Sequence, residues 1–190
     1  MPSLNEIGLK YKADKSSNLH NYFKVYERIF SPLRDKVTSV LEIGVHKGGS
    51  LRMWAEYFNN AKIVGVDINQ ECKFTEPNIS VEIGDATSYT FMNEVIKKHG
   101  FFDIIIDDGS HHTSHMIKSF KLFFSSVVKV GGYYIIEDLA TQSNAFWGKY
   151  YGAQDIPNYT FFDFMKELLQ EMNTGDPSNP NVGSFYPNIE

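Results

Sequence analysis

The stretch from Ser39 to Ser50 constrains the fold of this chain more than any other segment. It opens with a short apolar run that contains one acid, Glu42, a pattern typical of a buried parallel strand. Gly44 and Gly48 follow the run, and after Ser50 apolar residues recur at the spacing of a helix. A strand, a glycine-rich loop and a helix in this order bring backbone N–H groups and a helix N-terminus up to a ligand. We therefore expect a ligand to bind at this loop.

A second apolar run, over residues 62–67, ends in Asp67, 23 positions after Gly44. An acid at the end of this strand can accept hydrogen bonds from both hydroxyls of a ribose. The glycine pattern is Glu-x-Gly-x-x-x-Gly, the signature of class I methyltransferases that use S-adenosylmethionine (SAM), and not the Gly-x-Gly-x-x-Gly of nicotinamide enzymes. We favour a SAM site over an empty Rossmann-like fold. Its candidate residues in these two segments are Glu42, Gly44, Gly48, Ser50 and Asp67.

Strand and helix patterns alternate from residue 39 to residue 138. Further strands are predicted at 79–83, 101–106 and 133–136, and helices at 87–99, 116–127 and 159–172. This alternation predicts an α/β fold of the Rossmann-like class, with a doubly wound, mainly parallel sheet. A methyltransferase sheet normally closes with two more strands. At most one is visible before the chain stops at 182–190, so we expect the closing strands to be abbreviated or truncated.

The chain of 190 residues is predicted to form a single methyltransferase domain, residues 1–190. Residues 1–35 are a helical lead-in, in which apolar residues repeat at helical spacing from Leu19 to Phe30. Residues 36–138 form the cofactor-binding core. Residues 139–190 contribute an aromatic-rich loop on the substrate side, a helix and a C-terminal segment.

Composition and charge argue against several classes of protein. The net charge is −5 and no basic stripe is present, which disfavours a nucleic-acid partner. Cys72 is the single cysteine, so an internal disulfide is excluded and the chain fits the reducing cytoplasm. Neither a signal peptide nor an apolar run of membrane-spanning length is visible. We therefore expect a cytoplasmic protein without a membrane span.

Acidic residues end the third, fourth and fifth predicted strands. Asp85 can meet the adenine amino group of a cofactor or cap the next helix, and both roles stay open. Asp107 and Asp108 end the fourth strand, and Glu137 and Asp138 end the fifth. Neighbouring strands lie about 4.8 Å apart, so these carboxylates converge, and converging carboxylates favour a cation such as Mg²⁺ between them. The alternative is that they cap helices or pair with lysines.

Successive strand residues face opposite sides of a sheet, so Asp107 and Asp108 have different predicted roles. We assign Asp108 to the metal, and Asp107 to the cofactor. His111 follows three positions after Asp108 and is the candidate general base, because an unperturbed imidazole titrates near about pH 6.5 and can accept a hydroxyl proton at neutral pH. The other histidines to which no role is assigned include His20 and His115.

These motifs together resemble the metal-dependent sugar O-methyltransferases of antibiotic pathways, such as the mycinamicin and tetracenomycin rhamnosyl enzymes. The core of the resemblance consists of Leu41–Trp54, Val64–Ile68, Asp107–His111 and Glu137–Asp138. The segment Ala13–Ser16 and the pair Tyr22 and Tyr26 are also similar to the lead-in of that family.

The resemblance implies SAM-dependent, Mg²⁺-assisted methylation of a hydroxyl on a sugar, in a glycosylated natural product or a surface polysaccharide. By position, it implies metal ligands at Asp108, Glu137 and Asp138, and a general base at His111. The expected partner is a small-molecule or glycan acceptor, and a homo-oligomer is compatible with the family. A catechol-type O-methyltransferase and a non-catalytic SAM-binding subunit remain as alternatives.

Overall fold

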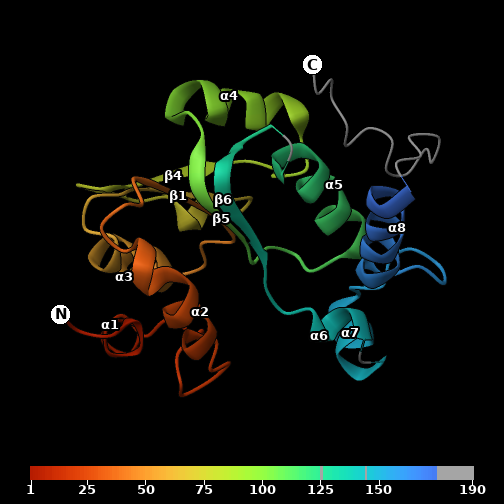
Figure 1. Cartoon of the computed structure of the whole chain (residues 1–190), viewed down its shortest axis with the longest axis horizontal. Coiled ribbons are helices and arrows are strands. Elements are labelled where there is room, and N and C mark those ends of the chain that lie inside the picture. The colour runs from red at the N-terminus through yellow and green to blue at the C-terminus, as the bar shows by residue number, and fades with distance from the viewer. Residues whose placement is uncertain (125, 144, 175–190) are drawn as a thin grey trace.

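A mainly parallel, six-stranded sheet forms the centre of the computed structural model, which describes residues 1–124, 126–143 and 145–174 (Figure 1). The strands are β1 (Ser39–Ile43), β2 (Lys62–Asp67), β3 (Thr75–Glu76), β4 (Ile79–Ile83), β5 (Phe102–Asp107) and β6 (Val128–Ile136). Their order is β3-β4-β2-β1-β5-β6, and each pair is parallel except β3 with β4. β1 and β5 are mostly apolar because both of their faces are buried. The predicted doubly wound α/β fold is confirmed.

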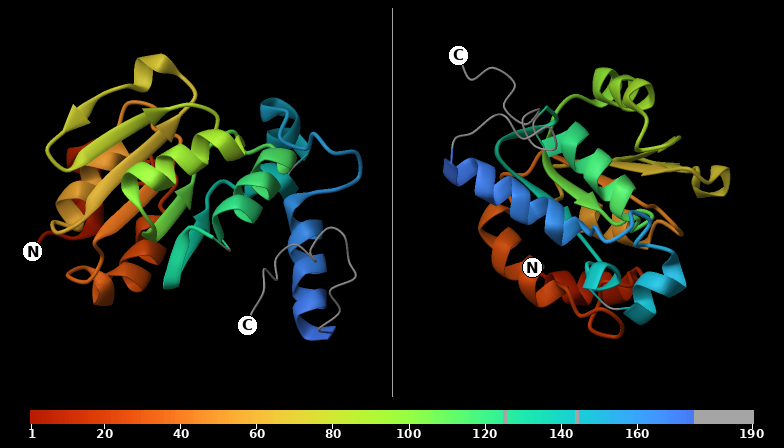
Figure 2. Two further views of the ribbon diagram at one scale, coloured as in Figure 1. Left: turned by 90° about the horizontal axis from the view of Figure 1, so that it is seen from above. Right: turned by 90° about the vertical axis from the view of Figure 1, so that its right-hand side faces the viewer.

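Helices cover both faces of the sheet (Figure 2). They are α1 (Leu4–Lys10), α2 (Phe23–Phe30), α3 (Gly49–Tyr57), α4 (Tyr89–His99), α5 (Thr113–Phe124), α6 (Ala140–Ser143), α7 (Ala145–Tyr151) and α8 (Phe161–Thr174). The first three share a core with Val40 and Ile104 of the sheet. α4 and α5 pack against the opposite face, on Leu41 and Ile105, and α8 packs on α5. Because the strand order reverses at β1, the carboxyl ends of β1, β2 and β5 are where a ligand crevice is expected.

The lead-in differs from the sequence prediction in two ways. α2 begins at Phe23 and not at Leu19, whose side chain is exposed. The reason is Asn21, which has a φ of 57° and so cannot lie inside a right-handed helix. The structure also contains α1, which the polar composition of the first residues concealed. Ser3 and Glu6 form a capping box at its start, and Leu4 and Ile7 are buried whereas Leu9 is exposed.

The last strand and the segment after it also differ from the prediction. β6 begins at Val128 and continues through Gly131, where the sequence indicated a turn followed by a strand from Tyr133. Gly131 has a φ of 80°, and the register between β5 and β6 shifts between Phe102 and Ile104, so the glycine is part of an irregular strand. The predicted substrate-side loop contains the short helices α6 and α7. The final stretch, 182–190, in which at most one closing strand was expected, lies outside the described residues.

Within the described residues, no helix combines the length and the apolar composition that a membrane crossing requires.

Candidate active site

The carboxyl ends of β1, β2, β4 and β5 border a cavity of about 380 Å³. The residues predicted from the sequence that line it are Gly44, Asp67, Asp85, Asp107 and His111. It lies where the strand order reverses, and its volume is within the range of about 300–1,000 Å³ that is usual for small-molecule sites. His115 also lines it, from α5, although the sequence assigned that residue no role.

Asp67, at the end of β2, orders the glycine-rich loop at the cavity wall. Its Oδ2 accepts hydrogen bonds from the backbone N–H groups of Val45 (2.8 Å) and His46 (3.2 Å), and its Oδ1 accepts one from Asn69 (2.9 Å). Partial burial alone would raise the pKa of this carboxyl, but the three backbone donors outweigh burial and lower it. Asp67 is therefore ionised at neutral pH. A carboxylate has about four acceptor positions, which leaves capacity for a ligand hydroxyl.

Asp85 lines the cavity at the end of β4. Its Oδ1 accepts hydrogen bonds from the backbone N–H and the hydroxyl of Thr87, both at 2.8 Å, and the backbone donation is the main reason its pKa is lowered. The cap of α4 is Ser88, whose hydroxyl accepts from the N–H of Phe91 at 3.4 Å. Of the two roles that the sequence left open, helix capping thus belongs to Ser88, and Asp85 closes the preceding turn.

The other candidates near β1 do not all reach the cavity. Gly44, with a φ of 93°, lines the cavity. It lies so close to the loop after β5 that a Cβ at this position would be 2.1 Å from the carbonyl oxygen of Asp108. Gly48 lies under the ring of Phe74 and is not part of the cavity wall. Glu42, in β1, and Ser50, in α3, are buried and do not line the cavity. Only Gly44 of this group therefore faces the cavity.

Asp107 is buried and lines the cavity, as expected for the acid assigned to the cofactor. Burial raises its pKa to about 6, although its Oδ2 accepts a hydrogen bond from the hydroxyl of Tyr134 at 2.9 Å. Its other oxygen accepts a long bond of 3.4 Å from the N–H of Gly109. A carboxyl with this pKa changes charge close to neutral pH, which is typical of functional sites.

Asp108, His111 and Asp138 form a compact cluster beside the cavity. Each offers a ligand atom, and these atoms all lie within 4.8 Å of one another. His111 Nε2 lies 3.6 Å from Asp138 Oδ2. His111 and Asp138 have φ values of 58° and 53°, which are uncommon for residues other than glycine and are often found where backbone strain serves a site. Two carboxylates and an imidazole at this spacing could hold a divalent cation.

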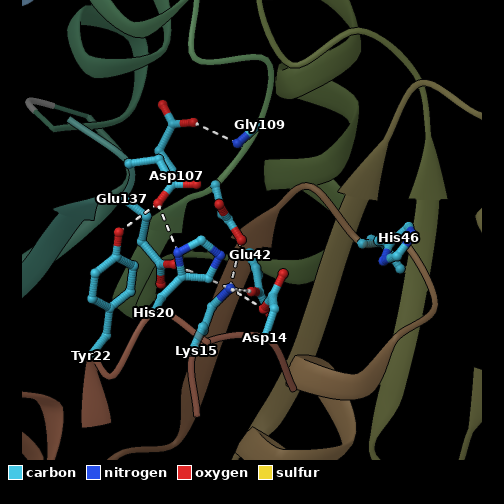
Figure 3. A network of polar contacts seen from close by, with 12 residues as sticks. Asp14, Lys15, His20, Tyr22, Glu42, His46, Asp107, Gly109 and Glu137 are labelled. Carbon is cyan, nitrogen blue, oxygen red and sulfur yellow. Dashed lines mark hydrogen bonds and ion pairs between the residues drawn. The ribbon is translucent and has the colours of Figure 1, made fainter. Parts of the chain in front are cut away.

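A buried lysine, Lys15, lies next to this cluster, with the acids Asp14, Glu42 and Glu137 around its ammonium group (Figure 3). Lys15 is 1% exposed, and its Nζ lies 2.5 Å from Asp108 Oδ2, 3.1 Å from Glu42 Oε1 and 3.2 Å from Glu137 Oε2. Burial would lower the pKa of Lys15, but the surrounding acids raise it well above the usual value. The ammonium is therefore charged. Sequence reasoning missed it, and the available signal was the Ala13–Ser16 motif, which carried no assigned role.

Glu137 and Asp138 face different surroundings. Glu137 is buried between Lys15 and the hydroxyl of Tyr26, and burial raises its pKa well above the usual value. Asp138 accepts a hydrogen bond of 2.5 Å from the hydroxyl of Tyr22 at Oδ1. Of the three predicted metal ligands, the structure therefore brings Asp108 and Asp138 together with His111. It places the Glu137 carboxylate at the adjacent lysine.

The sequence profile of the FtsJ-like methyltransferases matches residues 15–138, from the buried lysine to the last acid of the cluster. The chain belongs to the FtsJ-like methyltransferase family. Membership agrees with the sheet order and with a cavity at the carboxyl ends of the strands.

Relatives within this family include sugar O-methyltransferases. The chain is 34% identical to the 8-demethyl-8-alpha-L-rhamnosyl tetracenomycin-C 2'-O-methyltransferase of Streptomyces olivaceus, in an alignment that covers all of this chain and 54% of the relative. It is 36% identical to the mycinamicin VI 2''-O-methyltransferase of Micromonospora griseorubida, in an alignment that covers 97% of this chain and 48% of the relative. The chain thus spans about half the length of the curated relatives it matches. The resemblance inferred from the sequence motifs is confirmed.

A solved structure of the MycE methyltransferase from the mycinamycin pathway, in complex with Mg, SAH and mycinamycin VI, has a similar fold. Its TM-score is 0.78 at 36% identity, and the match covers 90% of this chain and 48% of that one. The FtsJ-like fold of this chain is thereby matched by an experimentally determined relative.

Proposed function

We propose that this chain is the catalytic domain of a SAM-dependent, Mg²⁺-assisted O-methyltransferase. Its acceptor would be a sugar hydroxyl in a glycosylated natural product or a surface polysaccharide. The observation that carries the proposal is the position of His111, which lines the cavity and is also part of the three-residue cluster. One imidazole therefore faces both the space for a cofactor and the place for a cation. The names of the two curated relatives support a sugar hydroxyl as the acceptor.

The residues around the cavity fit SAM. The volume of about 380 Å³ suits a ligand of this size. Asp67 is ionised and keeps capacity to accept a hydrogen bond from a ribose hydroxyl, and Asp85 follows the strand end where an adenine amino group can be met. Gly44 allows a close approach to the backbone. Asp107 lines the cavity nearest the cluster and would face the charged end of the cofactor.

The residues of the cluster fit a divalent cation. Asp108 and Asp138 offer oxygen ligands, which Mg²⁺ prefers, and Glu137 adjoins them. The buried acids Glu42, Asp108 and Glu137 surround a single ammonium group, and burial raises the pKa of each of them. Glu42 Oε1 lies 3.1 Å from that ammonium, but neither oxygen of Glu42 accepts a hydrogen bond of good geometry among the described residues. A cation bound beside these acids would favour their ionised forms.

When bound, SAM supplies an electrophilic methyl group and the cation supplies positive charge that stabilises the developing charge on the acceptor hydroxyl. The chain supplies the proton acceptor and the orientation. His111 takes the hydroxyl proton at Nε2, and in this role its imidazole stays outside the ligand set, whose oxygens come from Asp108 and Asp138. Asp138 Oδ2, 3.6 Å from that nitrogen, stabilises the imidazolium that results. The strained backbone of both residues holds the two groups in this relation.

The test combines binding with methyl transfer. SAM affinity is measured by isothermal titration with and without Mg²⁺, and transfer of a labelled methyl group is measured with a panel of acceptors. The panel contains mycinamicin VI, the 8-demethyl-8-alpha-L-rhamnosyl tetracenomycin-C used by the relative, and catechol. We expect SAM binding and Mg²⁺-dependent methylation of a glycoside. Methylation of catechol alone would favour a catechol-type enzyme, and SAM binding without any transfer would favour a non-catalytic subunit.

A further inference from the structure

The N-terminal lead-in directs one donor to each acid that the sequence assigned to the metal. The pairs are Lys15 with Asp108, Tyr22 with Asp138, and Tyr26 with Glu137. The Nζ–Oδ2 distance in the first pair and the Oη–Oδ1 distance in the second are both 2.5 Å. The acids follow β5 and β6, whereas all three donors come from residues 15–26, so this pairing depends entirely on the tertiary fold (Figure 3).

The three donors are held in a fixed arrangement. Tyr22 directly precedes α2, and Tyr26 lies four residues further on, so the two side chains project from the same side of the helix. The backbone N–H of Tyr22 donates to the carbonyl oxygen of Lys15 at 3.0 Å, which closes the loop between them. The ring of Tyr26 is buried edge-on against Trp54, with centroids 5.6 Å apart. Because the donor side chains are held in place by these contacts, they can hold the carboxylates that they contact in one orientation.

Each hydroxyl also fixes which carboxylate oxygen is left for the other contact of its acid. Tyr22 binds Oδ1 of Asp138, which leaves Oδ2 as the oxygen 3.6 Å from His111 Nε2. Tyr26 binds Oε1 of Glu137, which leaves Oε2 toward the ammonium of Lys15, 3.2 Å away. Hydrogen bonds of this kind orient metal-binding carboxylates, and their loss typically costs about 10–100-fold in metal affinity or activity.

We propose that Tyr22 and Tyr26 are positioning residues of the metal site, whose hydroxyls set the rotation of the Asp138 and Glu137 carboxylates before a cation binds. The inference rests on the proposed function, since it assumes that these acids hold a divalent cation. Under this proposal the N-terminal lead-in contributes to the metal site and also packs against one face of the sheet. The alternative is that the hydroxyls only satisfy buried acids, in which case their loss would affect stability and leave metal affinity unchanged.

The test uses the whole chain and Mn²⁺ as a paramagnetic probe. Mn²⁺ affinity is measured by electron paramagnetic resonance for the wild type, Tyr22→Phe and Tyr26→Phe, and SAM affinity and metal-free thermal stability are measured in parallel. We expect about tenfold or greater loss of Mn²⁺ affinity in each variant, with unchanged SAM affinity, because Asp67 and Asp85 lie at the other end of the cavity. Tyr22 is only half-buried, so its variant is expected to fold even if Tyr26→Phe does not.

Tyr57→Phe is the matched control. Tyr57 is also buried in the layer of α1, α2 and α3, and its hydroxyl donates to Glu27 at 3.1 Å, away from the cluster. It should lose stability but keep the Mn²⁺ affinity of the wild type. A double-mutant cycle sharpens the test, because Tyr22→Phe should have almost no further effect on Mn²⁺ affinity once Asp138 is replaced by Asn.

Two outcomes would overturn the inference, and they are distinguishable. If the wild type binds Mn²⁺ and Tyr22→Phe binds it within twofold, the tyrosine has no positioning role and the proposed function is unaffected. If the wild type binds SAM but no Mn²⁺, the metal part of the proposed function fails, and the inference fails with it.

Discussion

Asp103 and Asp108 lie at opposite ends of β5, and their surroundings differ in kind. Asp103 accepts hydrogen bonds from the N–H groups of Thr38 and Ser39, and Lys129 Nζ lies 2.8 Å from its other oxygen. Burial opposes ionisation of Asp103, but these donors lower its pKa to about 2. At the other end, burial raises the pKa of Asp108 even though Lys15 touches it.

Asp103 is a structural carboxylate, whereas Asp108 belongs to the proposed metal site. Asp103 joins the amino ends of β1 and β5 and favours the folded state when it is ionised. The buried acids Glu42 and Glu137 have raised pKa values mainly because of burial, so their ionised forms oppose folding. A fold that keeps such unfavourable groups together, buried around Lys15 and next to the three-residue cluster, is consistent with a site that binds a cation.

The largest expected effect is a loss of turnover on substitution of His111, in the loop that follows Asp108. His111→Ala should lower turnover by about two to four orders of magnitude, because the group that accepts the hydroxyl proton is lost. SAM affinity should be unchanged, since Asp67 and Asp85 remain in the cavity wall. The measurement is single-turnover methyl transfer to the acceptor found in the panel, with SAM titrated separately.

His112→Ala is the control for this variant, because His112 is absent from both the cavity wall and the three-residue cluster. It should stay within a few-fold of the wild type. A His111→Ala protein that retains nearly full turnover would falsify the assignment of His111 as the base and would leave proton removal to another group.

Asp67→Ala should weaken SAM binding by roughly tenfold or more, because it removes a charged acceptor for the ribose and the anchor of the loop at Val45. Isothermal titration gives the affinity. Asp35→Ala, at an exposed position, is the control and should bind SAM as the wild type does. Equal affinities in the two variants would remove Asp67 from the cofactor site.

Asp103→Asn tests the structural end, and we expect a loss of about 1 kcal/mol of unfolding free energy at pH 7. The folded pKa of about 2 lies below the ordinary value of 3.8, so the stabilisation is present above pH 3.8 and is lost as the pH falls toward 2. Urea unfolding of both proteins across this window should show the difference between their unfolding free energies shrinking as the pH falls. If that difference persists at pH 2, the charge of Asp103 is not its cause.

Glu42→Gln should have the smallest effect, and in the opposite direction. The folded pKa of Glu42 is raised above 4.5, chiefly by burial, so its ionisation reduces stability as the pH rises above 4.5. Replacing it should raise the stability of the metal-free protein at neutral pH by about 0.5–1 kcal/mol and change little below pH 4.5. Destabilisation at neutral pH would show that the Lys15–Glu42 contact outweighs burial.

The sequence predicted the sheet well because its strands are buried apolar runs that end in acids. It predicted less where local rules conflict with tertiary packing. Gly131 indicated a turn, but the irregular pairing of β6 with β5 keeps it within a strand. α1 was missed because a capping box in a polar stretch has few apolar residues to mark it.

Within the site, the residues at strand ends were found because their positions follow from the alternation of strands and loops. Lys15 was missed because a lysine in a polar stretch is normally solvated, and its burial among acids of three strands depends on long-range packing. Consecutive strand residues face opposite sides of a sheet, and this holds for Glu137 and Asp138 as it does for Asp107 and Asp108. Their different surroundings were therefore readable from the sequence.

The contact of Gly44 with Asp108 has a consequence for how this domain can diversify. A methyl group at position 44 would meet the Asp108 carbonyl at 2.1 Å, so the loop after β1 could not change there without moving the loop after β5. A substitution in the loop after β1, at the proposed cofactor site, would thus also move the loop after β5, at the proposed metal site. The helix α6 is also joined to the loop after β5, because Gln142 Nε2 donates to the carbonyl oxygen of His111 at 2.8 Å. Variation in acceptor choice is therefore expected in α7 and α8 before α6. Engineering of new acceptor ranges should begin in those helices.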